Sequence, residues 1–254
     1  MGLRKTVVSA LKRTHLIGVA RRMRDIASPS IRLQEKRMVS FYRQFVAAGD
    51  LVFDVGANVG NRTAVFLKLG ARVVAVEPQD ACVHTLRQKF GKHPGFILVT
   101  EALSSNEGEG EIRVSDESTV SSMASDWIDS VKSSGRFGDI DWGQTQRVRL
   151  TTLDSLIRKH GLPAFCKIDV EGYEPVVLKG LSQRIPAISF EFTPEFFTAA
   201  MECVQHLSAI GYDRFNFSDG ESMQLVLQSW LSAEAILRHL RAVPPNAFGD
   251  VYAM

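Results

Sequence analysis

The stretch LVFDVGANVG, residues 51–60, decides the fold. Its first half is apolar apart from Asp54 and contains β-branched and aromatic side chains, which predicts a buried strand. Gly56 ends this strand, and helical character begins at Asn61. The stretch therefore predicts a strand that passes through a glycine turn directly into a helix, as in a parallel α/β sheet.

The same alternation continues along the chain and predicts an α/β fold: a Rossmann-like parallel sheet with helices on both faces. Extended runs are predicted at 72–76, 96–100, 148–150, 165–170, 187–192, 212–217 and 250–254, and helices at 61–69, 79–90, 152–160, 174–180 and 194–210. The sequence GEGE at 108–111 suggests a turn between extended segments.

Composition excludes several classes of protein. The chain has 254 residues, of which 45% are hydrophobic, and this suits one large domain or one domain with an appendage. No apolar stretch approaches the roughly 18 residues of a membrane-spanning helix. The three cysteines lie far apart, which argues against a disulfide framework and a structural zinc site and favours a cytoplasmic location.

Charge is distributed unevenly along the chain. Residues 1–48 contain eleven basic and two acidic residues, a net charge of +9, whereas the remainder carries −7. We expect a basic helical arm over residues 1–46 and a catalytic domain over 47–254. Two interpretations of the arm stay open: a helix packed on the acidic body, or an amphipathic helix at an anionic membrane surface or on nucleic acid. The acidic body makes a nucleic-acid partner the less favoured choice, and the sequence indicates no oligomeric state.

The segment 115–146 differs from the rest because it is rich in Ser, Asp and Gly and shows no clear periodicity. Loops of this length inside a compact domain usually have a function. We interpret the segment as a lid or a substrate-contacting insertion, with a plain surface excursion as the alternative.

Ligands of open parallel sheets bind at the carboxyl ends of the strands, where the first glycine turn lies. Gly56 permits close approach of a ligand to the backbone, and Ala57 follows it in the turn. Asn58 takes the place of a middle glycine, because asparagine tolerates a positive φ. Gly60 lets the helix begin close to the ligand. This turn is predicted to bind a cofactor.

Acidic residues end the first three predicted strands. Asp54 is placed to accept a hydrogen bond from a ligand ammonium group. Glu77 lies 21 positions after Gly56, where a carboxylate accepts hydrogen bonds from both hydroxyls of a ribose. Glu101, followed by Ala102, is placed to reach the amino group of an adenine. The chain lacks the Gly-x-Gly-x-x-Gly pattern, which disfavours a pyrophosphate and leaves S-adenosylmethionine as the predicted cofactor.

At this point the sequence resembles the FkbM-type S-adenosylmethionine-dependent methyltransferases. The resemblance runs from about residue 45 to 181 and is carried by residues 51–78, by Thr-Leu-Asp at 152–154, and above all by KIDVEGYE at 167–174. It implies a seven-stranded methyltransferase sheet with its last strand pair reversed. It also implies O-methylation of a hydroxyl on a small molecule such as a polyketide, or on a sugar or glycan.

Three carboxylates are the candidate catalytic residues. Asp169 and Glu171 end the fourth long strand, and Glu191 ends the next. An alcohol that accepts a methyl group must lose a proton, which one of these carboxylates is placed to take. We favour Asp169 beside the cofactor and Glu171 as base or orienting group. Alternatively, Asp169 and Glu191 hold a divalent cation that lowers the pKa of the hydroxyl.

Two other classes of function remain to be weighed. The basic arm is compatible with an RNA-binding methyltransferase, which would bind RNA in a salt-sensitive way. The sheet is compatible with a nicotinamide-dependent oxidoreductase, although no Tyr-x-x-x-Lys pair is found.

Overall fold

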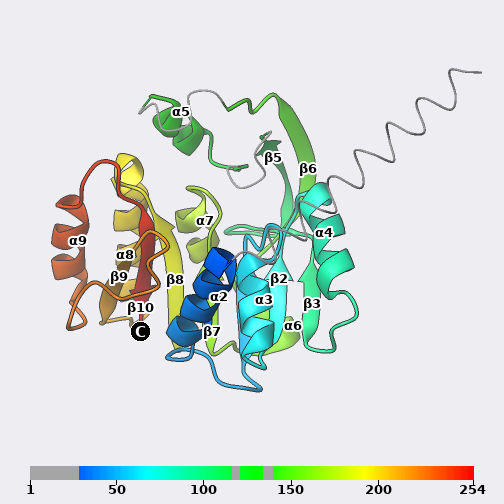
Figure 1. The fold of residues 1–254 in the computed structure, drawn as a ribbon. Coiled ribbons are helices and arrows are strands. Elements are labelled where there is room, and N and C mark those ends of the chain that lie inside the picture. The colour runs from blue at the N-terminus through cyan, green and yellow to red at the C-terminus, as the bar shows by residue number, and fades with distance from the viewer. Residues whose placement is uncertain (1–28, 116–120, 134–139) are drawn as a thin grey trace, which may run out of the picture.

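A computed structural model describes residues 29–115, 121–133 and 140–254, and its centre is a seven-stranded sheet in the order β3-β2-β1-β7-β8-β10-β9 (Figure 1). The strands are β1 (Leu51–Val55), β2 (Arg72–Val76), β3 (Phe96–Val99), β7 (Phe165–Ile168), β8 (Ala187–Phe192), β9 (Phe215–Asp219) and β10 (Gly249–Ala253). The strand order reverses between β1 and β7. The site of an open α/β sheet is expected at that point.

Six of the seven strands run in the same direction, and only β10 runs antiparallel to its neighbours β8 and β9. The strand β1 is buried from its second to its last residue because helices cover both faces. The last strand is inserted between β8 and β9, so the last pair is reversed in order. The predicted fold class is confirmed.

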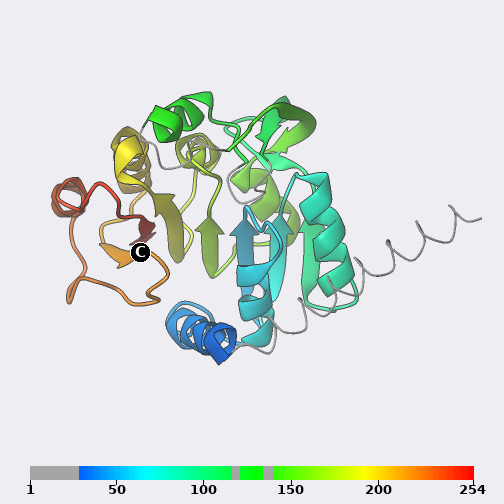
Figure 2. The ribbon, with the colours of Figure 1, turned by 45° about the horizontal axis from the view of Figure 1, so that its top comes forward.

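Helices cover both faces of this sheet (Figure 2). One face packs against α2 (Pro29–Tyr42), α3 (Asn61–Lys68) and α4 (Asp80–Phe90), and the other against α6 (Leu153–His160), α7 (Glu174–Lys179), α8 (Phe197–Ala209) and α9 (Ala233–Arg241). The Thr152 hydroxyl caps the N-terminus of α6, because it accepts a hydrogen bond from the Ser155 N–H at 3.1 Å.

A second, three-stranded sheet lies above the carboxyl ends of the main strands, next to α5 (Ser125–Ser133) (Figure 1). Its strands are β4 (Ala102–Leu103), β5 (Gly108–Val114) and β6 (Gln144–Thr151), in the order β4-β6-β5. The predicted turn at 108–111 is wrong, since these residues are the first half of β5 and pair with β6. The glycines suggested a turn, but Gly110 faces Met123 and Leu150, where a Cβ would be crowded.

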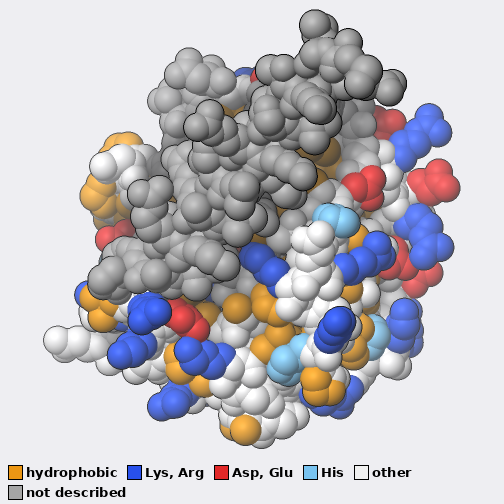
Figure 3. Space-filling model, turned by 45° about the vertical axis from the view of Figure 1, so that its right-hand side comes forward, with side chains coloured by type: hydrophobic (Ala, Val, Ile, Leu, Met, Phe, Trp, Pro, Cys, Tyr) orange, Lys and Arg blue, Asp and Glu red, His pale blue; other side chains and the backbone are white. Residues whose placement is uncertain are grey.

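The described part of the basic arm packs on the body. Tyr42 at the end of α2 is fully buried, and its ring lies 4.9 Å from that of Phe66 and 5.8 Å from that of Phe165. Residues 29–46 therefore pack on the body, as the first interpretation of the arm expected. Residues 1–28 of the predicted arm lie outside the described residues. Across the described ranges, every helix is too short or too polar to cross a membrane. Basic and acidic side chains both occur on the uncovered part of the face in Figure 3.

Candidate active site

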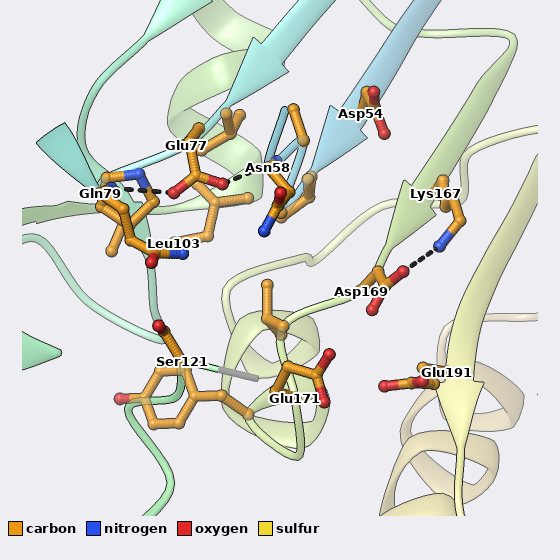
Figure 4. Close-up of a pocket in the computed structure, with 18 of the residues that line it drawn as sticks. Asp54, Asn58, Glu77, Gln79, Leu103, Ser121, Lys167, Asp169, Glu171 and Glu191 are labelled. Carbon is orange, nitrogen blue, oxygen red and sulfur yellow. Dashed lines mark hydrogen bonds and ion pairs between the residues drawn. The ribbon is translucent and has the colours of Figure 1, made fainter. Parts of the chain in front are cut away.

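A cavity of about 240 Å³ opens at the carboxyl ends of β1, β2, β7 and β8 (Figure 4). It lies at the predicted reversal point of the sheet. Nine of the residues predicted from the sequence line it: Asp54, Gly56, Ala57, Asn58, Glu77, Ala102, Asp169, Glu171 and Glu191.

The glycine turn is forced by close packing between two strand ends. Gly56 has a φ of 76°, and a Cβ at this position would lie 1.8 Å from the backbone oxygen of Asp169. The amides of Gly56 and Ala57 both donate to the Val76 carbonyl at 3.0 Å. Only glycine therefore allows the loops after β1 and β7 to approach each other and to form one wall of the cavity.

Glu77 is held by the turn that follows β1. The Asn58 N–H donates to one carboxylate oxygen at 2.7 Å, and the Gln79 N–H donates to the other at 2.8 Å. Asn58 has a φ of 48°, which confirms the predicted positive φ. Burial raises the pKa of the Glu77 carboxyl to about 7, although the backbone hydrogen bonds act in the opposite direction.

Asp54 forms the wall of the cavity between β1 and β7. Its side chain is buried and accepts a hydrogen bond from the Thr63 hydroxyl. Burial raises the pKa of this carboxyl, and the Thr63 hydroxyl and the Lys167 ammonium oppose the rise. Lys167 is the register partner of Asp54 on β7.

Two predicted cofactor residues lie outside the cavity. The Cα of Gly60 faces α4, where a Cβ would lie 2.4 Å from the Phe90 ring, so this glycine serves the packing of α3 on α4. The Glu101 carboxylate pairs with Arg149 at 2.8 Å. The chain bends after β3, and Ala102 and Leu103 line the cavity in place of Glu101. The structure does not support a contact of Glu101 with a bound adenine.

The three candidate catalytic carboxylates lie together. Oxygen atoms of Asp169, Glu171 and Glu191 all lie within 4.8 Å of one another. Burial, and then the neighbouring carboxylates, raise the pKa of Glu171 and Glu191 well above the ordinary glutamate value. A carboxylate with a raised pKa is a suitable acceptor for the proton of a hydroxyl near neutral pH. Oxygen ligands at this spacing are also the type that divalent cations prefer.

Lys167 is a site residue that we did not predict. Its side chain is 2% exposed, and its ammonium lies 2.6 Å from Asp169 and 3.7 Å from Asp250. Burial alone would lower the pKa of this ammonium, but the two carboxylates raise it well above the usual value. The signal was present in the sequence, because a lysine inside a buried strand requires an acidic partner.

The loop that carries Glu171 has an unusual backbone. Glu171 has a φ of 54° and Gly172 a φ of 88°, and a Cβ on Gly172 would lie 2.3 Å from the Trp127 side chain. The Ser122 hydroxyl donates to the Glu171 carbonyl at 2.6 Å. Within the loop, the Val170 N–H donates to the Glu174 carboxylate at 2.9 Å. The insertion therefore contacts the loop directly from outside the main sheet.

Four further lining residues were not among the individual site residues that we predicted. Ser121 and Met123 belong to the insertion, Tyr173 to the loop after β7, and Arg62 to α3. Arg62 binds both oxygens of Glu221 at 2.6 and 2.7 Å. Tyr173 lies within the family motif at 167–174, and Ser121 and Met123 lie within the predicted insertion, but neither pattern singled out these side chains; Arg62 belongs to no motif.

The fold and the site together define a Rossmann-like α/β enzyme with a nucleoside-type cofactor cavity. The sequence model of the FkbM methyltransferase domain matches residues 54–217. A hexuronic acid methyltransferase from Haloferax volcanii is 25% identical over 144 residues, 56% of this chain and 54% of that protein. The chain thus spans about half the length of this curated relative.

Two crystal structures are similar to the chain at low sequence identity. A precorrin-6y C5,15-methyltransferase from Geobacter metallireducens superposes with a TM-score of 0.46, 11% identity, and 86% and 87% coverage of the two chains. An Aeropyrum pernix fibrillarin with S-adenosylmethionine bound superposes with a TM-score of 0.45 and 8% sequence identity. The match covers 83% of this chain and 68% of the fibrillarin chain.

The family model matches more than half of this chain, so the chain belongs to the FkbM methyltransferase family. The predicted family is confirmed, and the matched domain is of the methyltransferase class.

Proposed function

We propose that the protein transfers a methyl group from S-adenosylmethionine to a hydroxyl of a sugar or a related polyol. The observation that carries this proposal is the division of one cavity into two ends. Glu77, fixed by two backbone N–H groups, lies at one end, and Asp169, Glu171 and Glu191 gather at the other (Figure 4). The named activity of the hexuronic acid relative supports a sugar as acceptor.

The first end suits the nucleoside. The Glu77 carboxylate lines the cavity, and we infer that it accepts hydrogen bonds from the two ribose hydroxyls. Ala102 and Leu103 offer an apolar surface for the adenine ring. The Asp169 carboxylate, held by the Lys167 ammonium, belongs to the second end, and we assign it to the methionine part of the cofactor.

The second end suits the transfer. The cofactor supplies a methyl group already activated on a sulfonium, so the protein has mainly to position the acceptor and remove its proton. The oxygen–methyl bond forms as the sulfur–methyl bond breaks, and the hydroxyl proton passes to a carboxylate. We assign that role to Glu171, with Glu191 orienting the hydroxyl. The alternative, a divalent cation on Asp169 and Glu191, stays open.

Calorimetry with S-adenosylhomocysteine tests the cofactor half of the proposal. The native protein should bind it, and Glu77→Gln should weaken binding by about tenfold or more, the loss of charge-assisted hydrogen bonds. Glu101→Gln is the matched control, because it makes the same chemical change outside the cavity and should leave the affinity unchanged. An equal loss in both variants would contradict the assignment of Glu77.

Methyl transfer to a panel of glycosides, followed by product mass, tests the acceptor half. A mass increase of one methyl group on a hydroxyl is expected, and Glu171→Gln should abolish turnover while sparing cofactor affinity. If a chelator abolishes turnover and Mg²⁺ restores it, the assignment of Glu171 as the base is wrong and a divalent cation on Asp169 and Glu191 takes its place.

A further inference from the structure

Arg62 on α3 is a basic side chain of the cavity that the proposed function does not use. It lines the cavity together with Glu221, which lies shortly after β9. The Arg62 side chain is 15% exposed, whereas that of Glu221 is 55% exposed. Because a guanidinium stays charged throughout the physiological pH range, Arg62 places a permanent positive charge at the wall of the cavity.

The ion pair between Arg62 and Glu221 uses only part of the guanidinium. One terminal nitrogen, Nη2, donates to both Glu221 oxygens at 2.6 and 2.7 Å. The other, Nη1, donates to the sulfur of Met38 at 2.7 Å, and a thioether is a weak acceptor. The Nε–H is buried and has no hydrogen-bond partner among the described residues. The pair therefore lacks the two parallel N–H groups through which arginine binds a carboxylate most strongly.

The Glu221 carboxylate is also free to leave. Its side chain is more than half exposed, and an ion pair with one member in solvent contributes little to stability. The backbone of Glu221 is attached separately, because its carbonyl accepts a hydrogen bond from the Gln34 side chain at 2.8 Å. The carboxylate can thus turn away from Arg62 into solvent while the backbone stays in place.

Arg62 lies near the second end of the cavity. Burial raises the pKa of the Asp250 carboxyl, and the nearby Lys167 and Arg62 oppose the rise. Asp250 lies 3.7 Å from the Lys167 ammonium, which lies 2.6 Å from Asp169. In Figure 4, Lys167 and Asp169 lie across the cavity from Glu77. Arg62 therefore belongs to the side to which we assign the methionine part of the cofactor and the acceptor.

We propose that Arg62 is a carboxylate-binding residue of the active site and that Glu221 takes the ligand's place in the free protein. A ligand carboxylate displaces Glu221 and binds the guanidinium. Two ligands of the proposed function carry such a group: the amino-acid part of S-adenosylmethionine, and an acceptor that is a uronic acid. The inference rests on the proposed function and adds a recognition residue to it.

Two pairs of probes distinguish these sources near pH 7.5. S-adenosylhomocysteine carries an amino-acid carboxylate and methylthioadenosine does not, and calorimetry measures the affinity of each. The methyl pyranosides of glucuronic acid and glucose also differ by one carboxylate. Their affinities are compared by ligand-observed NMR titration on protein saturated with S-adenosylhomocysteine.

Two variants change opposite members of the ion pair. Glu221→Ala removes the competitor, so the carboxylate-bearing probe of one pair should bind at least about threefold more tightly, while its carboxylate-free counterpart is unchanged. Arg62→Lys keeps the charge but loses the planar guanidinium and should weaken the same probe by about fivefold or more. Glu221→Ala decides alone if Arg62→Lys does not fold.

Glu35→Ala is the matched control. It removes an exposed glutamate that pairs with Lys68 of the same helix α3, at 2.7 Å, and neither residue lines the cavity. This variant should leave the affinities of all four probes unchanged.

Each outcome assigns the carboxylate or overturns the inference. A selective response of S-adenosylhomocysteine identifies the cofactor as its source, and a selective response of the glucuronide identifies the acceptor. If neither carboxylate probe responds to Glu221→Ala, or if each changes equally with its carboxylate-free counterpart, Arg62 and Glu221 form only a structural ion pair and the inference is wrong. If neither nucleoside binds the native protein, the proposed function is wrong and the inference falls with it.

Discussion

At the scale of single residues, the cavity depends on where backbone groups point. Glu77 would be a poorly solvated acid if the turn after β1 did not direct the Asn58 N–H toward it. That turn exists because Asn58 and Gly56 accept positive φ values. The sequence predicted both features, since the residue types that tolerate such a backbone are few.

The raised pKa of Glu77 predicts a pH dependence of cofactor binding. Ribose hydroxyls donate to the ionised carboxylate, so binding below pH 7 must first remove a proton. The affinity for S-adenosylhomocysteine should fall toward acid by up to tenfold per pH unit below about 7 and level off above it. Calorimetry between pH 5.5 and 8.5 measures this, and Glu77→Gln should flatten the profile.

The stability of the free protein should change in the opposite direction over the same range. Because the folded-state pKa of Glu77 lies above its ordinary value of 4.5, the folded protein holds this proton more tightly than the unfolded chain. The contribution of this group to the free energy of unfolding is complete below pH 4.5 and is lost as the pH rises through about 7. A thermal melting series of native protein and Glu77→Gln separates this contribution from that of other groups.

A single methyl group should disrupt the contact between the two strand ends. Gly56→Ala would place a Cβ on the Asp169 carbonyl, in addition to the cost of a positive φ, about 1–2 kcal/mol. We expect a clear drop in melting temperature and loss of S-adenosylhomocysteine binding. Gly49→Ala is the control, because Gly49 also has a positive φ of 88° but nothing lies within 4 Å of its Cβ position. Similar losses in both variants would show that backbone strain alone is responsible.

At the scale of elements, the insertion and the loop after β7 act on each other. Ser122 is 1% exposed, and its hydroxyl both accepts from the Ala124 N–H at 2.9 Å and donates to the Glu171 carbonyl. Trp127 closes the space above Gly172. These contacts hold Glu171 in a conformation that non-glycine residues rarely adopt.

Removal of the Ser122 hydroxyl should therefore affect turnover more than cofactor binding. We expect Ser122→Ala to reduce kcat several-fold on an accepted glycoside and to change the affinity for S-adenosylhomocysteine less than twofold. Ser122→Thr, which keeps the hydroxyl, should restore most of the activity. Ser133→Ala removes a similar hydroxyl-to-carbonyl bond at the exposed end of α5 and should have no effect. A kcat unchanged in Ser122→Ala would refute the positioning of Glu171 by the insertion.

The strands of the main sheet could be predicted, whereas in the three-stranded second sheet only part of β6, at 148–150, was expected as extended. Buried strands such as β1 and β2 are mostly apolar runs, and Gly56 after β1 and Pro78 after β2 mark where they end. The strand β5 has mostly exposed or half-buried side chains and begins with glycines, so only its pairing with β6 makes it a strand. The contacts of Lys167 with Asp169 and Asp250 depend on which strands lie close together in the sheet. The local sequence does not specify that order.

At the scale of the whole molecule, α2 forms part of the domain although it belongs to the basic arm by composition. A chain that begins at Pro29 should melt close to the full chain, whereas one that begins at Ala47 should melt much lower. The second loses Tyr42 and its neighbours from the core, and large buried aromatic residues contribute about 3–5 kcal/mol each. Equal melting temperatures would mean that α2 only lies on the surface.

The same truncation tests a membrane role for the arm, which we retain as a proposal. Residues 1–28 contain seven basic residues and one acidic residue, a charge suited to anionic lipid headgroups. The full chain should sediment with anionic vesicles and the chain from Pro29 should not, while both bind S-adenosylhomocysteine equally. If both chains sediment with the vesicles, the lipid contact belongs to residues 29–254 and not to residues 1–28.

The place of β10 between β8 and β9 has a consequence for biosynthesis. During translation β8 and β9 leave the ribosome first, yet they pair with each other only through a strand that is made later. Until then the nascent polypeptide exposes an open edge at Ala187–Phe192, five of whose six residues are buried in the finished sheet. Unpaired apolar edges of this kind promote aggregation, so ribosome-bound intermediates of this enzyme should be clients of molecular chaperones.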